Sequence, residues 1–186
     1  AMLSRCGTKA VAKNKPVELK CGDFRDLSCW EDRRFDCVVS TGNALAYVSN
    51  EAVLMTLERM DAHVRPGGYL CFDSRNWEKI QREKQRFYLY NPFFHNGTRV
   101  NLVQVWDHNP DSSVTFNLLY TFEQNEKIIQ KEIFEEHYQP FTLKMIEDKL
   151  SDLGYGQLYL RPVPCDSPET DFEKMDWYRV IAQKPQ

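Results

Sequence analysis

The strongest constraint on the fold is a pair of apolar segments joined by a helix. The segments are "FDCVVSTGN" at 35–43 and "PGGYLCFDSR" at 66–75, and each runs from apolar residues into small and polar ones. Between them, residues 50–64 place Val53, Leu54, Leu57, Met60 and Val64 on one face of a predicted helix. Continuous apolar strands linked by a helix predict neighbouring parallel strands in an α/β sheet. The polar residues would then meet at the carboxyl ends of the strands, where open α/β sheets bind ligands.

The remaining pattern predicts further elements on both sides of this unit. Three long segments at 98–107, 113–123 and 127–138 are rich in β-branched and aromatic residues and are separated by the turn sequences "HNPDSS" and "EQNEK", which predicts an antiparallel meander. Thr142 is a predicted N-cap and Gly154 a predicted C-cap of a helix at 142–153. Other predicted elements are a helix at 2–14 and strands at 17–21, 35–40, 69–73, 156–161 and 177–183.

Composition limits the function classes. The 186 residues suit one domain, and the net charge of −3 without any basic run argues against a nucleic-acid partner. No apolar run approaches the roughly 20 residues of a membrane helix, so we expect no membrane partner. The six cysteines form no C-x-x-C pair, and Cys37 and Cys71 lie in apolar strands, which predicts buried, reduced thiols and a cytoplasmic location. The four histidines show no metal-binding spacing, so no metal site is expected.

The ordered series of motifs resembles class I S-adenosylmethionine-dependent methyltransferases. The series runs from a strand ending in Gly22-Asp23 through "FDCVVSTGN", the turn "RPGG" at 65–68 and the inserted strands to "LGYGQLYL" at 153–160. The resemblance implies one α/β domain with a Rossmann-like sheet of order 3-2-1-4-5-7-6, a core at 2–86 and 139–186, and an antiparallel β insertion at 87–138. It implies S-adenosylmethionine as cofactor and a small molecule as substrate. The cofactor-binding residues that it implies are Asp23, Phe24, Thr41, Gly42 and Tyr47.

Within this family, "GNALAYV" together with "DSRNWE" is similar to the glycine and sarcosine N-methyltransferases. This similarity implies that Asn43 and Arg75 contact an amino-acid substrate and that Tyr88 or Tyr90 adds a hydroxyl group. A guanidinium can hold a carboxylate through two hydrogen bonds, while an amide oxygen and a phenol orient the amine. Such a transfer depends mainly on positioning, so no catalytic acid or base is assigned.

The family's glycine-rich cofactor loop has no counterpart in the sequence. "RCGT" at 5–8 imitates it, but no strand precedes it and Lys9 stands where a glycine is required. "MLSRCGTKA" instead resembles the helix that follows the family's second strand, so we expect an N-terminally truncated sheet that binds S-adenosylmethionine weakly or not at all. The missing strands would leave the edge of "FDCVVS" open. We therefore expect a homo-oligomer, or a "VELKC" strand at 17–21 that has moved beside "FDCVVS".

Each candidate residue also has an ordinary structural explanation. Asp23 can cap a turn at Gly22, Asn43 can serve turn geometry, and Arg75 can pair with a surface carboxylate. Phe24, Tyr88 and Tyr90 can simply pack. Two functions follow: a small-molecule methyltransferase, with amino-acid N-methyl transfer as its specific form, or a non-catalytic remnant that acts as a protein-interaction module.

Overall fold

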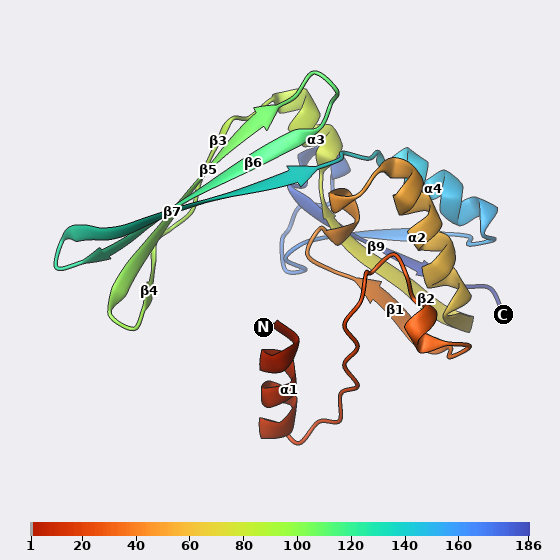
Figure 1. Cartoon of the computed structure of the whole chain (residues 1–186). Coiled ribbons are helices and arrows are strands. Elements are labelled where there is room, and N and C mark those ends of the chain that lie inside the picture. Colours follow the sequence, from red (N-terminus) through yellow and green to blue (C-terminus); the bar gives the residue numbers. More distant parts are fainter. Residues whose placement is uncertain (1) are drawn as a thin grey trace.

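The computed structural model describes residues 2–186, which form two sheets (Figure 1). The first sheet contains β1 (Phe35–Ser40), β2 (Val64–Arg75), β9 (Trp177–Gln183) and β8 (Leu158–Pro162) in the order β1-β2-β9-β8. β1 and β2 are parallel, with Val38 opposite Leu70, whereas β9 is antiparallel to both β2 and β8. This order is the 4-5-7-6 part of the expected sheet, which confirms the predicted α/β fold.

Two amphipathic helices lie together along the core sheet (Figure 1). α2 (Asn50–Ala62) begins at the N-cap Ser49 and buries Val53, Leu57 and Met60, as its apolar periodicity predicts. α4 (Leu143–Asp152) begins at Thr142, whose side chain accepts a hydrogen bond from the Met145 N–H group, so the predicted N-cap is confirmed. Short 3-10 turns at Ser28–Trp30, Ala44–Tyr47 and Phe172–Lys174 complete the core elements.

The second sheet is a long twisted ribbon that extends away from the core (Figure 1). Its strands are β3 (Phe87–Leu89), β4 (Phe93–His95), β5 (Thr98–His108), β6 (Val114–Gln124) and β7 (Lys127–Tyr138). All its pairings are antiparallel, in the order β3-β5-β6-β7 with β4 also on β5, which confirms the predicted meander. α3 (Trp77–Glu83) connects the carboxyl end of β2 to this sheet, so the insertion starts at the carboxyl ends of the parallel strands.

The N-terminal part differs from the prediction at one element. α1 (Met2–Ala12) forms as expected and buries none of its residues. The predicted strand at 17–21 is wrong, because these residues have no regular structure and Val17 and Leu19 are exposed. A strand needs a neighbour for its backbone hydrogen bonds. "VELKC" finds none, and the expectation that it pairs with β1 is also wrong.

β1 is more exposed than its apolar sequence predicts. Within residues 2–186 its only strand neighbour is β2, and Val39 is 52% exposed. The expectation of two buried cysteines holds for Cys71 and fails for Cys37, which is exposed on β1. A continuous apolar strand is buried on both faces only when elements cover both of them. In the described part of the chain one side of β1 remains uncovered.

Candidate functional site

The loop after β1 is tied to the carboxyl end of β2 by one carboxylate. Gly42 and Asn43 both have left-handed backbone, with φ angles of +76° and +62°. The Asp73 Oδ1 atom accepts hydrogen bonds from the Gly42 N–H group at 2.7 Å and from the Asn43 N–H group at 3.3 Å. Glycine and asparagine tolerate this conformation better than other residues. The "GN" pair therefore serves turn geometry and also holds the Asn43 side chain beside β2.

The Asn43 amide is buried and only half of its hydrogen-bonding capacity is used. Its Oδ1 atom accepts hydrogen bonds from the Ser74 hydroxyl and from the Arg75 N–H group, both at 3.1 Å. Its Nδ2 atom is buried without a partner among residues 2–186. A buried donor without an acceptor costs about 1–3 kcal/mol. The free group is thus the amide nitrogen rather than the oxygen expected from the sequence, and it suits a ligand oxygen.

Arg75 is a buried cation surrounded by aromatic rings. Its side chain is only 8% exposed, and its guanidinium carbon lies 5.2 Å from the Trp106 ring centre, 5.1 Å from that of Phe116 and 4.8 Å from that of Trp177. No carboxylate within residues 2–186 forms a salt bridge with it. Cation–π contacts offset part of the cost of burying this charge. A buried cation that lacks an anionic partner favours an anionic ligand group beside it.

The two candidate tyrosines have different surroundings. The Tyr90 hydroxyl lies 3.4 Å from the Arg75 Nη2 atom. The Tyr88 ring instead stacks on Trp106 with a centroid distance of 5.4 Å and an interplanar angle of 10°. Burial raises the pKa of the Tyr88 phenol above its ordinary value. Tyr90 therefore brings its oxygen to Arg75, while Tyr88 supports the aromatic cage around it.

A cavity of 250 Å³ beside β1 brings together two of the candidate cofactor residues, Phe24 and Thr41. Val38, Val39 and Met60 add apolar lining. This small apolar space is suitable for one flat heteroaromatic ring such as adenine. Gly42 and Tyr47 are not part of this lining.

Asp23 lines a neighbouring cavity of 500 Å³ together with Arg25 and Arg59. Its carboxylate accepts hydrogen bonds from the Arg25 N–H group at 2.9 Å and from the Arg25 Nε atom at 3.0 Å. These hydrogen bonds hold the pKa of Asp23 at about 2, well below its ordinary value. Asp23 thus caps its own turn, while its exposed carboxylate stays ionised and able to accept further hydrogen bonds.

Tyr47 faces the second sheet. Its hydroxyl lies 2.8 Å from the Tyr138 hydroxyl, and Tyr138 donates in turn to the Glu136 carboxylate. Burial raises the pKa of both phenols, so both remain protonated at neutral pH. This chain of hydrogen bonds joins the loop after β1 to β7. Sequence reasoning missed Asp73, Glu136 and Tyr138, although the position of Asp73 beside Arg75 in "FDSR" was a usable signal.

Within residues 2–186, no three His, Cys, Asp or Glu side chains gather as a metal site would require. In the same part of the chain, no helix combines the length and apolarity needed to cross a membrane.

Comparisons with known proteins bear on the fold. Residues 1–68 match the family model described as a methyltransferase domain. A search of curated proteins finds no match. Among solved structures, an S-adenosylmethionine-dependent methyltransferase from Clostridium acetobutylicum superposes with a TM-score of 0.77 and 16% identity, over 100% of this chain and 72% of that one.

Two other solved structures show the same fold. The CcbJ methyltransferase from Streptomyces caelestis has a TM-score of 0.72 and 16% identity, covering 100% of this chain and 71% of its own. The amino pentose methyltransferase CalS10 from Micromonospora echinaspora, solved with S-adenosylmethionine bound, has a TM-score of 0.69 and 14% identity, covering 96% of this chain and 70% of its own. The fold of this chain is therefore that of these methyltransferases.

Proposed function

We propose that this chain is part of an S-adenosylmethionine-dependent methyltransferase that acts on a small molecule, with the amine of an amino acid as the acceptor class. The match of residues 1–68 to a methyltransferase domain and the shared fold support the reaction type. The acceptor class rests on the residues at the carboxyl ends of β1 and β2.

The observation that supports an amino acid as the methyl acceptor is a pair of buried hydrogen-bond donors that lack an anionic partner. Among residues 2–186, the Asn43 Nδ2 atom has no hydrogen-bond partner, and the Arg75 guanidinium has only the Tyr90 hydroxyl at 3.4 Å. The two residues are joined by the hydrogen bond from the Arg75 N–H group to the Asn43 Oδ1 atom. A ligand that places a carboxylate at the Arg75 guanidinium and an oxygen atom at the Asn43 Nδ2 atom would satisfy both donors, as expected for an amino-acid acceptor.

Bound S-adenosylmethionine would supply an electrophilic methyl group. The chain's own contribution is to fix the acceptor carboxylate at Arg75 and to exclude water around it with Trp106, Phe116 and Trp177. Holding the acceptor in one orientation accelerates such a transfer without an acid or base from the protein. The cavity lined by Phe24 and Thr41 is the proposed adenine site, with Asp23 beside it.

We further propose that the isolated chain binds the cofactor weakly. Among residues 2–186 no glycine-rich turn connects a strand to a helix beside the adenine cavity. The ribose and methionine parts therefore gain few hydrogen bonds, each of which contributes about 1.5–3 kcal/mol when a charge is involved. A micromolar dissociation constant for S-adenosylhomocysteine by calorimetry would contradict this expectation.

The proposal is tested by methyl transfer at saturating S-adenosylmethionine. Glycine, its methyl ester and larger amino acids are offered as acceptors, and methylated product is detected by mass spectrometry. We expect glycine to be the better acceptor, because only glycine carries the carboxylate. Arg75→Leu should lower the specificity constant for glycine by roughly 10- to 100-fold, which corresponds to one charge-assisted contact.

A matched control comes from a nearby exposed arginine. Arg86 forms a surface ion pair with Asp107 at 3.1 Å, and Arg86→Leu should leave the transfer unchanged. Absence of product with every amino acid offered would refute the proposed reaction. An equal loss in both variants would refute the role of Arg75.

A protein-interaction module remains the second candidate, and the open edge of β1 favours it. The edge strand exposes Val39 and ends beside the half-exposed Phe24. An uncovered strand edge pairs readily with another chain. Methyl transfer by the chain would argue against this candidate, whereas a folded chain with neither transfer nor cofactor binding would favour it.

A further inference from the structure

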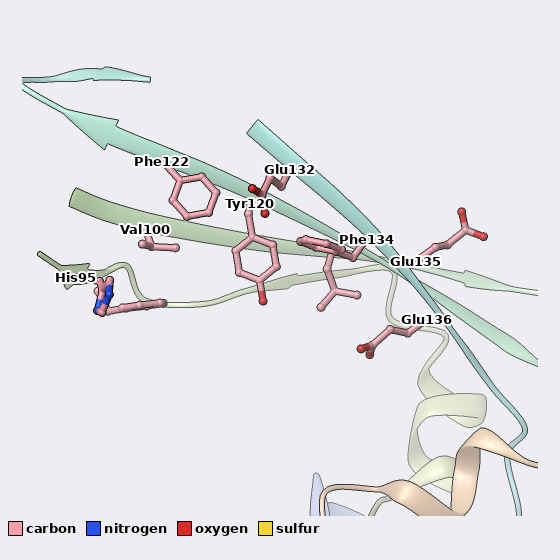
Figure 2. A pocket seen from close by; sticks show the side chains of 10 residues that line it. His95, Val100, Tyr120, Phe122, Glu132, Phe134, Glu135 and Glu136 are labelled. Atoms are coloured by element: carbon pink, nitrogen blue, oxygen red, sulfur yellow. The ribbon is translucent and has the colours of Figure 1, made fainter. Parts of the chain in front are cut away.

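The second sheet holds a cavity that the proposed function has not used. Its volume is 530 Å³, and aromatic side chains together with carboxylates line it (Figure 2). Tyr120, Phe122 and Phe134 come from β6 and β7. The carboxylates are those of the half-buried Glu132 and Glu136 and of the exposed Glu135, all on β7. This size and mixed lining are typical of sites for small organic molecules.

The strand register shows that this cavity and Arg75 share one face of the sheet. Phe116, whose ring lies under the Arg75 guanidinium, pairs with Glu136, and Tyr120 pairs with Glu132. Directly paired residues on antiparallel strands point to the same face, as do residues two and four positions apart on one strand. Tyr120 lies four positions beyond Phe116, which is about 13 Å along β6. One extended ligand could therefore reach from Arg75 into the cavity.

The aromatic rings form walls that the described chain leaves partly uncovered. The Tyr120 and Phe134 rings meet edge to face at a centroid distance of 5.9 Å, and the Phe122 ring lies nearly parallel to that of Tyr120 at 6.5 Å. Phe134 is nevertheless 51% exposed, and Phe93 is 55% exposed. Covering such rings with an apolar ligand would remove them from water, which is favourable.

The charges of the cavity favour a cation. Glu132 accepts a hydrogen bond from the Gln130 Nε2 atom at 2.6 Å, and Glu136 accepts one from the Tyr138 hydroxyl, so both acids have neutral partners. Within residues 2–186, the lining contains no lysine or arginine, and His95 is its one basic side chain. Carboxylates beside aromatic rings bind ammonium groups through charge-assisted hydrogen bonds and cation–π contacts.

We propose that this cavity binds an apolar, aromatic body that carries a protonated amine, with Glu132 holding the ammonium group. The assignment of this ligand as the methyl acceptor rests on the proposed function. In that assignment the acceptor's carboxylate lies at Arg75 while its far end, with a second amine that is not methylated, fills the cavity. The acceptor is then larger than glycine and cationic at its far end.

A small molecule suits this cavity better than a second copy of the chain. A two-fold contact through this face would bring each copy's Glu132 and Glu136 near the same patch of the other copy. Like charges that face each other in a sheet are unfavourable. A second copy thus leaves the carboxylates unpaired, whereas an ammonium group neutralises them.

The test compares two probes of the same shape in the absence of any cofactor. Tryptamine carries an ammonium group, and tryptophol carries a neutral hydroxyl in its place. Binding to the full chain is measured by saturation-transfer NMR and calorimetry. We expect tryptamine to bind roughly five- to tenfold more tightly than tryptophol, because the carboxylates are half-buried rather than fully exposed.

Three variants locate the effect. Glu132→Gln should weaken tryptamine about fivefold and leave tryptophol unchanged. Glu136→Gln should have a smaller effect, because Glu136 lies four positions along β7, opposite Phe116. Glu126→Gln is the matched control, because Glu126 is exposed in the turn between β6 and β7 and does not line the cavity. Thermal melting checks that each variant is folded, and Glu132→Gln remains decisive if Glu136→Gln fails to fold, since Glu136 also holds Tyr138.

Several results would overturn the inference. Equal binding of the two probes would contradict the role of charge, and an equal effect of Glu126→Gln would show that the amine does not bind at Glu132. No probe binding together with dimerisation that Glu132→Gln strengthens would identify a second copy as the occupant. Tryptamine binding without any methyl transfer would keep the cavity assignment and refute only the proposed function, so the two failures are distinguishable.

Discussion

The carboxylate of Asp73 holds the candidate site together. It is 7% exposed and accepts hydrogen bonds from two consecutive backbone N–H groups of the loop after β1. The Arg179 guanidinium lies 3.7 Å away on β9. The side chain therefore fixes the left-handed conformation of Gly42 and Asn43 from the neighbouring strand. Without it, the Asn43 amide would no longer be held beside Arg75.

We predict that Asp73→Ala destabilises the chain by about 2–3 kcal/mol, because a buried backbone donor loses a charged acceptor. Urea denaturation measures this free energy of unfolding. Asp36→Ala is the control, since Asp36 is exposed and pairs only with the exposed Arg65, and we expect a change within about 0.5 kcal/mol. Equal effects of the two substitutions would show that Asp73 does not organise the loop.

Cys71 makes stability depend on pH in the alkaline range. Burial, and next the nearby Cys37 thiol at an Sγ–Sγ distance of 3.8 Å, raises the pKa of Cys71 from its ordinary value near 9 to about 12. A raised pKa means that the folded chain retains its proton after the unfolded chain has lost it. This stabilisation is complete below pH 9 and is lost as the pH rises from 9 towards 12.

We predict that the free energy of unfolding under reducing conditions falls by about 0.5–1 kcal/mol per pH unit between pH 9 and 10. The full theoretical slope is not expected, because the Cys71 thiol of the unfolded chain, with an ordinary pKa near 9, is only partly ionised between pH 9 and 10. Cys71→Ala should have a flatter profile over the same interval, whereas Cys165→Ala, at an exposed thiol, should keep the original slope. Identical slopes in all three proteins would contradict the assignment.

At the level of elements, the sequence correctly predicted the helices and strands whose packing partners are present in this chain. Apolar periodicity predicted α2, capping residues predicted α4, and β-branched and aromatic segments between turn sequences predicted the meander of β5, β6 and β7. The elements against which these residues pack are present in the structure. Two predictions were wrong, the strand at 17–21 and the full burial of β1. "VELKC" has no strand beside it among the described residues, and "FDCVVS" has a strand on one side only. Local pattern predicts a strand, but pairing decides whether it forms.

The candidate site also contains residues that the sequence located and residues that it did not. The sequence located Asn43 and Arg75 because both directly follow apolar strands whose ends meet in the sheet. It did not locate Glu136 and Tyr138, since β7 comes from a distant part of the chain and its alternating pattern does not show which face turns towards the loop. Register between strands decides that point, and a shift by one residue would turn these side chains away.

At the scale of the whole molecule, the uncovered side of β1 predicts self-association. Val39 is 52% exposed, and the backbone groups of β1 on the side away from β2 have no strand partner among residues 2–186. These groups reach water in the isolated chain, so the drive to associate comes from covering apolar side chains and extending the sheet rather than from rescuing buried polar groups. A strand edge that meets its own copy gives a two-fold contact.

We therefore predict a dimer whose population rises with concentration, measured by size-exclusion chromatography with light scattering. Val39→Lys should favour the monomer, because a charged side chain blocks edge pairing. Val17→Lys is the matched control, since Val17 is 51% exposed but lies outside any strand. Ile133→Lys tests the other large apolar surface, as Ile133 is 70% exposed on β7. A chain that stays monomeric at every concentration refutes the prediction, and a dimer lost only in Ile133→Lys moves the contact to the second sheet and refutes pairing through β1.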